Sequence, residues 1–407
     1  MTMKNTIIKY VAAGLALVAL SACHNAEYAP LSGVGSGVAF IAQTQTQAYA
    51  SQGITLGMEE VFVETAIRLT DPAAEDCSFT LAKDATALEK FNKRKSTTYV
   101  PLPDDFFSIT DAEDNPVTQV KVLKGQSMSS SLRVHVKPLT DEMVDSGLKY
   151  AIPVTLKSQD AKVEVLESAA SMVYVLNRLP IQDVPKVNTN SKILGMFNGK
   201  VSTFTQWTWE VNVNMDQLGT GIGQLNNQAI LNVTLSGNEI YVRFGDAPIE
   251  GNRLQIKTQG TQFESQTLFN INTWYHIAFV CNGSQVLLYI NGQLDNSLDV
   301  GGNSYTLDEN GGDGGSNFQM ASSGSYFKAN AMFAEMRFWS VARSQAEIQN
   351  NMYSCDPASE GLMCYYKFNE GTGTSFTDYS LGAEEGAGRA HAATDFPWIP
   401  DVRIDGK

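Results

Sequence analysis

Apolar and polar side chains alternate most strictly in residues 206–214 of the chain, QWTWEVNVN. Successive side chains of a β-strand point to opposite faces, so this pattern predicts a strand with one apolar face and one polar face. The apolar positions are Trp207, Trp209, Val211 and Val213, and the polar positions are Gln206, Thr208, Glu210, Asn212 and Asn214. We expect the apolar face to pack into a core and the polar face to meet solvent or a ligand.

Residues 274–294 predict a β-hairpin. The first run, residues 274–281, is rich in β-forming residues and closes at Asn282-Gly283, where both residues tolerate a positive φ. The second run, residues 286–290, is continuously apolar and ends at the turn signal Asn291-Gly292.

Short apolar runs separated by turn residues also fill residues 24–180, which is typical of a β-sandwich. Within this part, only residues 85–95 predict a helix. The stretch 177–192 contains two prolines and several polar residues, which indicates a linker. We therefore predict a first domain at 24–180, a linker at 181–192 and a second domain at 193–407.

The first 23 residues have the features of a targeting segment rather than of a folded element. Lys4 and Lys9 precede an apolar run at residues 11–20, which is too short to span a bilayer. The run ends in Leu20-Ser21-Ala22-Cys23, which resembles the bacterial lipoprotein box and implies lipidation of Cys23. The alternative is an ordinary signal peptide that is cut nearby. Lipidation predicts an anchor in the outer membrane, with the surface favoured over the periplasm.

The second half of the chain resembles the laminin-G-like domains, which are concanavalin A-like jelly rolls. Three separated motifs in the family's order carry the resemblance: the hairpin at 274–294, AEMRFWSVARSQAEI at 334–348, and GLMCYYKFNEGTGTSFTDYSLG at 361–382. The middle motif includes a capping box at Ser344 and Glu347. Residues 91–110 and 149–158 resemble an uncharacterised immunoglobulin-like N-terminal domain of gut-bacterial lipoproteins, which often precedes laminin-G-like or family-18 glycoside hydrolase modules. The two resemblances imply an all-β chain, an Ig-like sandwich followed by a jelly roll, in which the first domain serves as a spacer.

Charge and cysteine content narrow the range of functions. The net charge of −14 argues against nucleic acid as a ligand, whereas the abundant amide and hydroxyl side chains suit neutral ligands. Apart from Cys23, the chain has four cysteines, and Cys355 and Cys364 are close enough in sequence to form a disulfide in an exported protein. The alternative is that Cys364, like Cys281, is a buried free cysteine on a strand.

The sequence lacks the signature of a catalytic site. A retaining glucanase of this fold needs two carboxylates about 5 Å apart, commonly supplied by E-x-D-x-E on one strand. No such string occurs, and the nearest stretch places Arg337 and Trp339 after Glu335. We therefore expect a protein that binds rather than an enzyme.

Two groups of residues are candidates for binding. The glycine-rich loop 301–317 carries Asp308, Asn310 and Asp313, oxygen ligands that suit Ca²⁺, although the same residue types also simply form loops. Tyr305 and Tyr326 flank this loop and are predicted to stack on sugar rings. Glu210, Asn212 and Asn214 are predicted to hydrogen-bond sugar hydroxyls from the polar strand face.

The family resemblance implies a lipid-anchored protein that captures an oligosaccharide or polysaccharide at the cell surface. In such a system the protein would present glycans to neighbouring glycan-degrading enzymes and an outer-membrane importer. The alternatives are a structural or adhesive lipoprotein with protein partners and, less favoured, a glycoside hydrolase with a different carboxylate pair.

Overall fold

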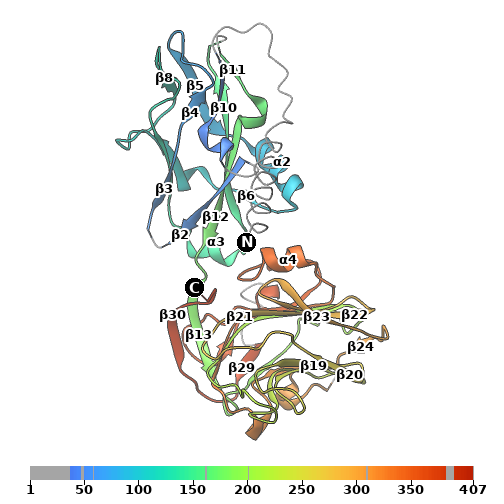
Figure 1. Ribbon diagram of the computed structural model, residues 1–407. Coiled ribbons are helices and arrows are strands. Elements are labelled where there is room, and N and C mark those ends of the chain that lie inside the picture. Colours follow the sequence, from blue (N-terminus) through green and yellow to red (C-terminus); the bar gives the residue numbers. More distant parts are fainter. Residues whose placement is uncertain are drawn as a thin grey trace, which may run out of the picture.

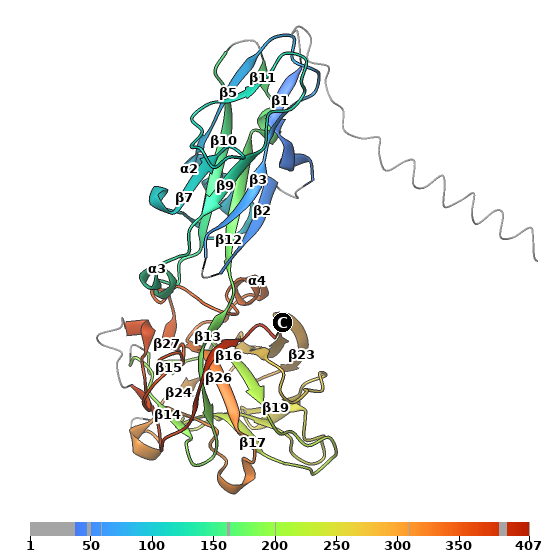
Figure 2. The ribbon, with the colours of Figure 1, turned by 90° about the vertical axis from the view of Figure 1, so that its left-hand side faces the viewer.

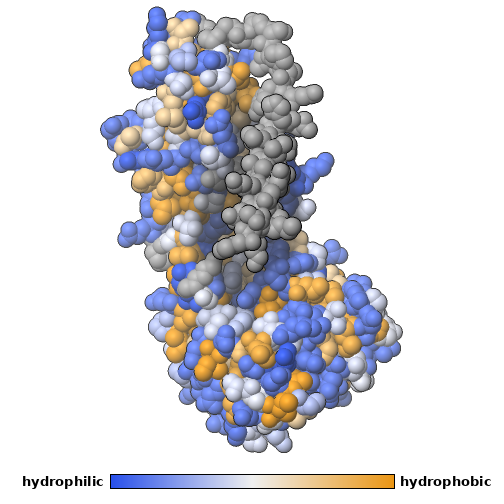
Figure 3. Space-filling view, viewed as in Figure 1, coloured by the Kyte–Doolittle hydropathy of each residue, from blue (hydrophilic) through white to orange (hydrophobic). Residues whose placement is uncertain are grey.

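The computed structural model describes residues 37–46, 50–57, 59–160, 163–199, 201–308, 310–381 and 389–406; Cys23 and the predicted signal segment lie outside these residues. Two β-rich domains are stacked end to end (Figures 1 and 2). On the face shown in Figure 3, hydrophilic and hydrophobic residues are interspersed over both domains. No helix within the described ranges is both long enough and apolar enough to cross a membrane.

The first domain is a β-sandwich. Its six-stranded sheet has the order β2-β12-β10-β5-β8 with β6 paired to β10, and the three-stranded sheets have the orders β11-β1-β4 and β3-β9-β7. Alternation builds its core, as in β9, where Leu132, Val134 and Val136 are buried. The strands are β1 (Val38–Ile41), β2 (Ser51–Leu56), β3 (Val61–Thr65), β4 (Ile67–Leu69), β5 (Cys77–Lys83), β6 (Val100–Pro101), β7 (Phe107–Thr110), β8 (Val120–Val122), β9 (Leu132–Val136), β10 (Tyr150–Ser158), β11 (Glu164–Val165) and β12 (Ser171–Arg178).

The predicted helix at 85–95 is confirmed as α2 (Ala85–Lys95). It begins where the Asp84 side chain accepts a hydrogen bond from Thr86 N–H, and it ends where Ser96 adopts a left-handed conformation. Leu88 and Phe91 on its buried face pack against β10 and β12. A second short helix, α3 (Asp141–Asp145), lies near the second domain.

The second domain is a sandwich of two large sheets. The proximal sheet, nearer the first domain, has the order β23-β22-β21-β16-β26-β13-β30 with β27 paired to β26; the distal sheet has the order β20-β19-β18-β17-β25-β14-β29-β28 (Figures 1 and 2). The only α-helix described here is α4 (Gln345–Asn350), on the side that faces the first domain. The strands are β13 (Ile181–Val187), β14 (Ile193–Gly195), β15 (Thr203–Phe204), β16 (Trp207–Met215), β17 (Gln228–Val233), β18 (Ile240–Phe244), β19 (Leu254–Thr258), β20 (Thr261–Glu264), β21 (Tyr275–Cys281), β22 (Gln285–Ile290), β23 (Gln293–Asp299), β24 (Tyr305–Thr306), β25 (Phe318–Met320), β26 (Ala331–Trp339), β27 (Leu362–Tyr366), β28 (Ser375–Phe376), β29 (Ala390–Ala392) and β30 (Trp398–Arg403).

The apolar side chains of both sheets meet in one core. Trp207 and Trp209 are fully buried there, as their strand positions predict. The predicted hairpin is confirmed as β21 and β22, which pair antiparallel from Ile277 with Ile290 to Cys281 with Val286. The chain is therefore all-β in class, with an N-terminal sandwich followed by a jelly-roll sandwich.

The predicted linker at 181–192 is wrong for its first seven residues. Residues 181–187 form β13, which pairs with β26 and with β30 near the C-terminus. Val184 and Val187 are fully buried. The proline signal misled because Pro185 sits in a strand whose partner is more than 200 residues away in the sequence, so only Leu179 and Pro180 separate β12 from β13.

The two domains touch through residues 147–149 of the first and the segment around Cys355 of the second. A Cβ atom on Gly147, whose φ is +66°, would lie 2.0 Å from the Cys355 carbonyl oxygen, so only glycine permits this approach. Burial, together with the positive charge of nearby Arg337, lowers the pKa of Lys149 to about 8. Cys355 and Cys364 are separate buried thiols, which fits the second of the two alternatives for this pair.

Candidate functional site

The outer face of the proximal sheet is polar but closed. Glu210 and Asn212 on β16 have no exposed surface, and Asn214 is 5% exposed. The prediction that these three side chains bind a glycan from an open face is therefore wrong for this structure. The reason is that residues 340–357, including α4, lie over the face: Asn212 Nδ2 donates to the Met352 carbonyl at 2.8 Å.

Ionic contacts hold this covering segment in place. Arg343, just before α4, approaches Glu210 Oε1 at 3.2 Å and lies over the Trp339 ring at 4.0 Å. Helix α4 begins with the predicted capping box, in which the Ser344 and Glu347 side chains each accept from the other's backbone N–H. These contacts fix residues 340–357 on the outer face of the sheet.

Arg337 occupies the centre of the covered face. Its guanidinium donates to the carbonyl oxygens of Asn351 at 2.5 Å and Met352 at 3.1 Å. Burial alone would raise the pKa of Glu210, but Arg337, the adjacent His276 and Arg343 together lower it to about 2. Glu210 is therefore an anion that is neutralised inside the protein.

Glu335, on the same face, has the opposite character. Burial raises its pKa to about 7 despite the nearby charge of Arg337, and Tyr365 donates to its Oε2 at 2.5 Å. The two carboxylates of this face thus serve buried contacts, and neither has a surface that a substrate could reach.

The two predicted stacking tyrosines differ completely in exposure. Tyr305 is fully buried, stacks on Phe204 with 5.7 Å between the ring centroids, and hydrogen-bonds Thr258 through its hydroxyl. Its prediction as a sugar platform is wrong, because β24 turns the ring into the core. Tyr326 is 59% exposed, in a short turn between β25 and β26.

The predicted calcium ligands lie on the loop but do not converge. Asp313 forms an ion pair with Lys192 at 2.6 Å, and Asp308 Oδ1 accepts from the Asn310 N–H at 2.9 Å. Among the residues that the structure describes, no three His, Cys, Asp or Glu side chains form a group that could hold a metal ion. Calcium binding stays a prediction.

The outer face of the distal sheet is also polar, but it is open. One row of register partners crosses all eight strands, and its members are half-buried or exposed except Leu194. From β28 to β20 the row contains Ser375, His391, Leu194, Gln319, Asn232, Tyr241, Lys257 and Gln262. Adjacent strands are about 4.8 Å apart, so the row forms a polar track across the sheet, and the Tyr241 ring lies inside it.

Comparison with known families and structures supports this architecture. Residues 35–163 match a family of N-terminal domains, and residues 191–349 match the laminin-G group of the concanavalin A-like lectin/glucanases superfamily. The second domain is a laminin-G-like domain. No curated protein matches the chain significantly.

A solved structure that is similar to this chain spans both domains. A protein of Bacteroides ovatus ATCC 8483, provisionally assigned as a carbohydrate binding protein, has a TM-score of 0.61 and 20% identity over 90% of this chain and 100% of that chain, which shows the shared fold. Domain 4 of AbnA, a GH43 extracellular arabinanase of Geobacillus stearothermophilus solved with arabinotriose, has a TM-score of 0.31 and 18% identity over 41% of this chain and 75% of that chain.

Beside the polar track, the laminin-G-like domain carries a network centred on Arg243. The guanidinium donates to Gln255 Oε1 at 2.7 Å and to Asn227 Oδ1 at 3.4 Å, and it also pairs with Asp246. The Tyr241 hydroxyl donates to the same Asn227 oxygen at 2.8 Å. These contacts fix the orientation of the Tyr241 ring, which is pre-organisation that a binding site needs.

The glycine-rich loop borders the other side of the track. Asp308 N–H donates to the Thr234 carbonyl at 3.2 Å, and Gly312 lies against the side chains of Thr234 and Gln319. The glycine-rich loop therefore borders the face of β17 and β25 and not the polar face of β16.

A sequence signal for the distal face existed. Residues 239–244, EIYVRF, also alternate over a shorter stretch, with Tyr241 and Arg243 at polar positions. Sequence reasoning missed this because it followed the tryptophan-rich strand, whose apolar face is more conspicuous.

Proposed function

We propose that the laminin-G-like domain binds a neutral oligosaccharide or polysaccharide along the distal face. The observation that carries the proposal is the uncovered polar track with Tyr241 inside it. An aromatic ring covers the apolar face of a sugar, and the flanking amides of Asn232 and Gln319 offer donors and acceptors to its hydroxyls. The Bacteroides ovatus structure, assigned to carbohydrate binding, supports the same ligand class.

Neutral glycans fit the charge of the site better than anionic ones. The Arg243 guanidinium is already engaged by Gln255, Asn227 and Asp246, and Lys257 lies 3.6 Å from Glu239. The chain as a whole carries a net charge of −14, which repels anions. Binding without cleavage is part of the proposal.

The test is calorimetric titration of a soluble chain, residues 24–407, with a panel of neutral glycans. Tyr241→Ala should weaken binding about 5- to 150-fold, equivalent to roughly 1–3 kcal/mol for loss of a stacking platform. Tyr326→Ala tests whether the neighbouring turn also contacts the glycan. The control is Phe62→Ala, because Phe62 is 48% exposed and lies in the first domain. Unchanged affinity in Tyr241→Ala would move the site elsewhere, and products released from the glycan would make the protein an enzyme.

We further propose that Cys23 is lipidated and holds the chain at the outer membrane, where neighbouring glycan-degrading enzymes and an importer would use the captured glycan. The lipoprotein box at residues 20–23 supports this arrangement. Cys23→Ala should move the protein from the membrane fraction to the soluble fraction.

A second candidate function is adhesion to a protein partner. It is favoured by aliphatic side chains on loops of the laminin-G-like domain: Ile222 is 65%, Leu268 49% and Ile271 48% exposed. Aliphatic groups suit protein surfaces better than sugar rings. A triple substitution of these residues with serine should leave glycan affinity unchanged if the distal face is the glycan site.

A further inference from the structure

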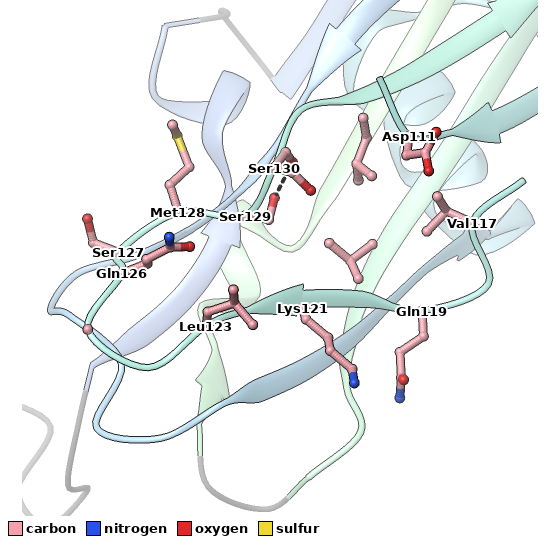
Figure 4. Close-up of a pocket in the computed structure, with 13 residues that line it drawn as sticks. Asp111, Val117, Gln119, Lys121, Leu123, Gln126, Ser127, Met128, Ser129 and Ser130 are labelled. Carbon is pink, nitrogen blue, oxygen red and sulfur yellow. Dashed lines mark hydrogen bonds between the residues drawn. The ribbon is translucent and has the colours of Figure 1, made fainter. Parts of the chain in front are cut away.

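The first domain carries a groove of about 890 Å³ at the edge of its six-stranded sheet. Figure 4 shows its two walls: strand β8 with Gln119, Lys121 and Leu123 on one side, and the facing segment 126–130 on the other. The turn at 123–126, closed by a hydrogen bond from Gln126 N–H to the Leu123 carbonyl, joins them. This volume lies within the range of ligand-binding pockets.

On the first wall, unpaired backbone groups face the groove. Strand β8 is the last strand of its sheet, and its Lys121 is the register partner of Ser78. Ser78 directs its backbone away from β8, since its N–H donates to Asp160 Oδ2 and its C=O accepts from Gln159 N–H. Partners in an antiparallel ladder turn their backbone groups either toward each other or both away. The N–H and C=O of Lys121 therefore point out of the sheet edge.

The second wall repeats this arrangement. Met128 bridges β4, and the hydrogen bonds on both sides of it are Leu69 N–H to the Ser127 carbonyl at 2.8 Å and Ser129 N–H to the Ile67 carbonyl at 2.9 Å. This pattern marks a pair that is not itself hydrogen-bonded, so the N–H and C=O of Met128 point away from β4. Within the part of the chain that the structure describes, neither Met128 nor Lys121 has a hydrogen-bond partner for these outward groups.

Polar and apolar side chains line the groove, and its two charged residues are Lys121 and Asp111. Leu123 and Met128 are 48% and 50% exposed, although both are large hydrophobic residues. Lys121 is exposed and makes no ion pair with any residue the structure describes. The one lining carboxylate, Asp111, is saturated by hydrogen bonds from Glu113 N–H and from the backbone and side chain of Asn115.

We propose that this groove binds an extended peptide segment of a partner protein, one that carries apolar and acidic side chains, by strand addition to β8. Unpaired backbone groups favour a polypeptide over a sugar, because an added strand satisfies N–H and C=O groups in turn. The exposed Leu123 and Met128 receive its apolar side chains, and Lys121 pairs with its carboxylate. The walls run over residues 119–123 and 126–130, and five residues in extended conformation span about 17 Å. This site is independent of the proposed glycan site.

The test uses the soluble chain, residues 24–407, and a synthetic array of seven-residue peptides in which apolar and acidic residues alternate. Fluorescence polarisation should find binders among them, and a bound peptide should slow amide hydrogen exchange at Lys121. The matched array has N-methyl groups on alternate amides, which keeps the side chains but removes the strand-forming donors; its members should not bind. Equal binding of both arrays, or of neither, would overturn strand addition.

Protein variants locate the site. Leu123→Asp and Met128→Asp should weaken binding at least about tenfold, as for other interface anchors, while Leu294→Asp, which is 55% exposed in the second domain, should not change it. Lys121→Glu should reverse the preference for acidic over basic peptides. If the glycan panel slowed amide hydrogen exchange at Lys121 and no peptide did, the groove would instead be a saccharide site.

Discussion

The two outer faces of the laminin-G-like sandwich start from the same sequence pattern and end in opposite states. Strand β16 and strand β18 both alternate polar and apolar residues, and both pack their apolar face into the shared core. Yet Asn212 on the proximal face has no exposed surface, whereas Asn232 on the distal face is half-buried. A polar strand face can therefore bind a ligand only where no other segment of the chain covers it.

The covering segment explains the difference in chemistry. On the proximal face, residues 340–357 exclude water, so each charge needs a partner, as Glu210 finds in Arg343 and His276. On the distal face, Lys257 and Glu239 are 37% and 43% exposed, and their 3.6 Å contact is screened by solvent. The proximal face stabilises the fold, while the distal face is free to bind.

Removing one arginine from each face should show this difference most strongly. Arg337→Met should lower the free energy of unfolding by about 3–5 kcal/mol, because it leaves Glu210 buried without its main neutralising charge and the Asn351 carbonyl without its guanidinium donor. Arg243→Met on the distal face should cost less, about 1–2 kcal/mol, because Arg243 is buried but its partner Asp246 is 35% exposed and keeps contact with water after the substitution. Urea unfolding measures both. Equal losses would mean that the distal network is as buried in solution as the proximal one.

The pH dependence of stability should carry the signature of the proximal face. The folded protein keeps the proton of Glu335 up to about pH 7, whereas the unfolded chain releases it near its ordinary pKa of 4.5. The folded state therefore binds more protons in this window, and stability falls as pH rises through it. Relative to Glu335→Gln, the wild type should lose about 3 kcal/mol between pH 4.5 and 7.

Comparison of the wild type with Glu335→Gln isolates this carboxyl group, because every other titratable residue is common to the two proteins. Unfolding free energies at a series of pH values test the pair. A constant difference between the wild type and Glu335→Gln would show that Glu335 titrates normally in the folded protein.

The sequence predicts more of the fold than of the candidate binding site. The hairpin at β21 and β22, helix α2 and the capping box at Ser344 depend on neighbouring residues, so local patterns reveal them. The burial of Asn212 depends on Met352, 140 residues later, and no local pattern contains that contact. The same limit explains the error at residues 181–187, whose strand partners lie near the C-terminus.

One asparagine from each face sharpens the comparison. Asn212→Ala should cost about 1–2 kcal/mol of stability because it removes a buried hydrogen bond to the Met352 carbonyl, while Asn232→Ala should stay within about 0.5 kcal/mol. Glycan binding should respond in the reverse order, with loss only in Asn232→Ala. Thermal unfolding and calorimetry on the same two samples give both quantities. A binding loss in Asn212→Ala at unchanged stability would place the ligand on the proximal face.

The smallest expected effect concerns calcium at the loop that borders the distal face. A calcium ion at Asp308, Asn310 and Asp313 would have to displace Lys192, which holds Asp313 at 2.6 Å. Weak sites bind calcium at about 10⁻³ M, so 1 mM Ca²⁺ should stabilise the protein by only about 0.4 kcal/mol. Lys192→Met removes the competitor and should increase the calcium-induced rise in melting temperature, whereas Lys192→Met combined with Asp313→Ala should abolish it. Mg²⁺ at the same concentration controls for ionic strength. If Ca²⁺ and Mg²⁺ shift the melting temperature of Lys192→Met equally, the loop is a border of the distal face and not a calcium site.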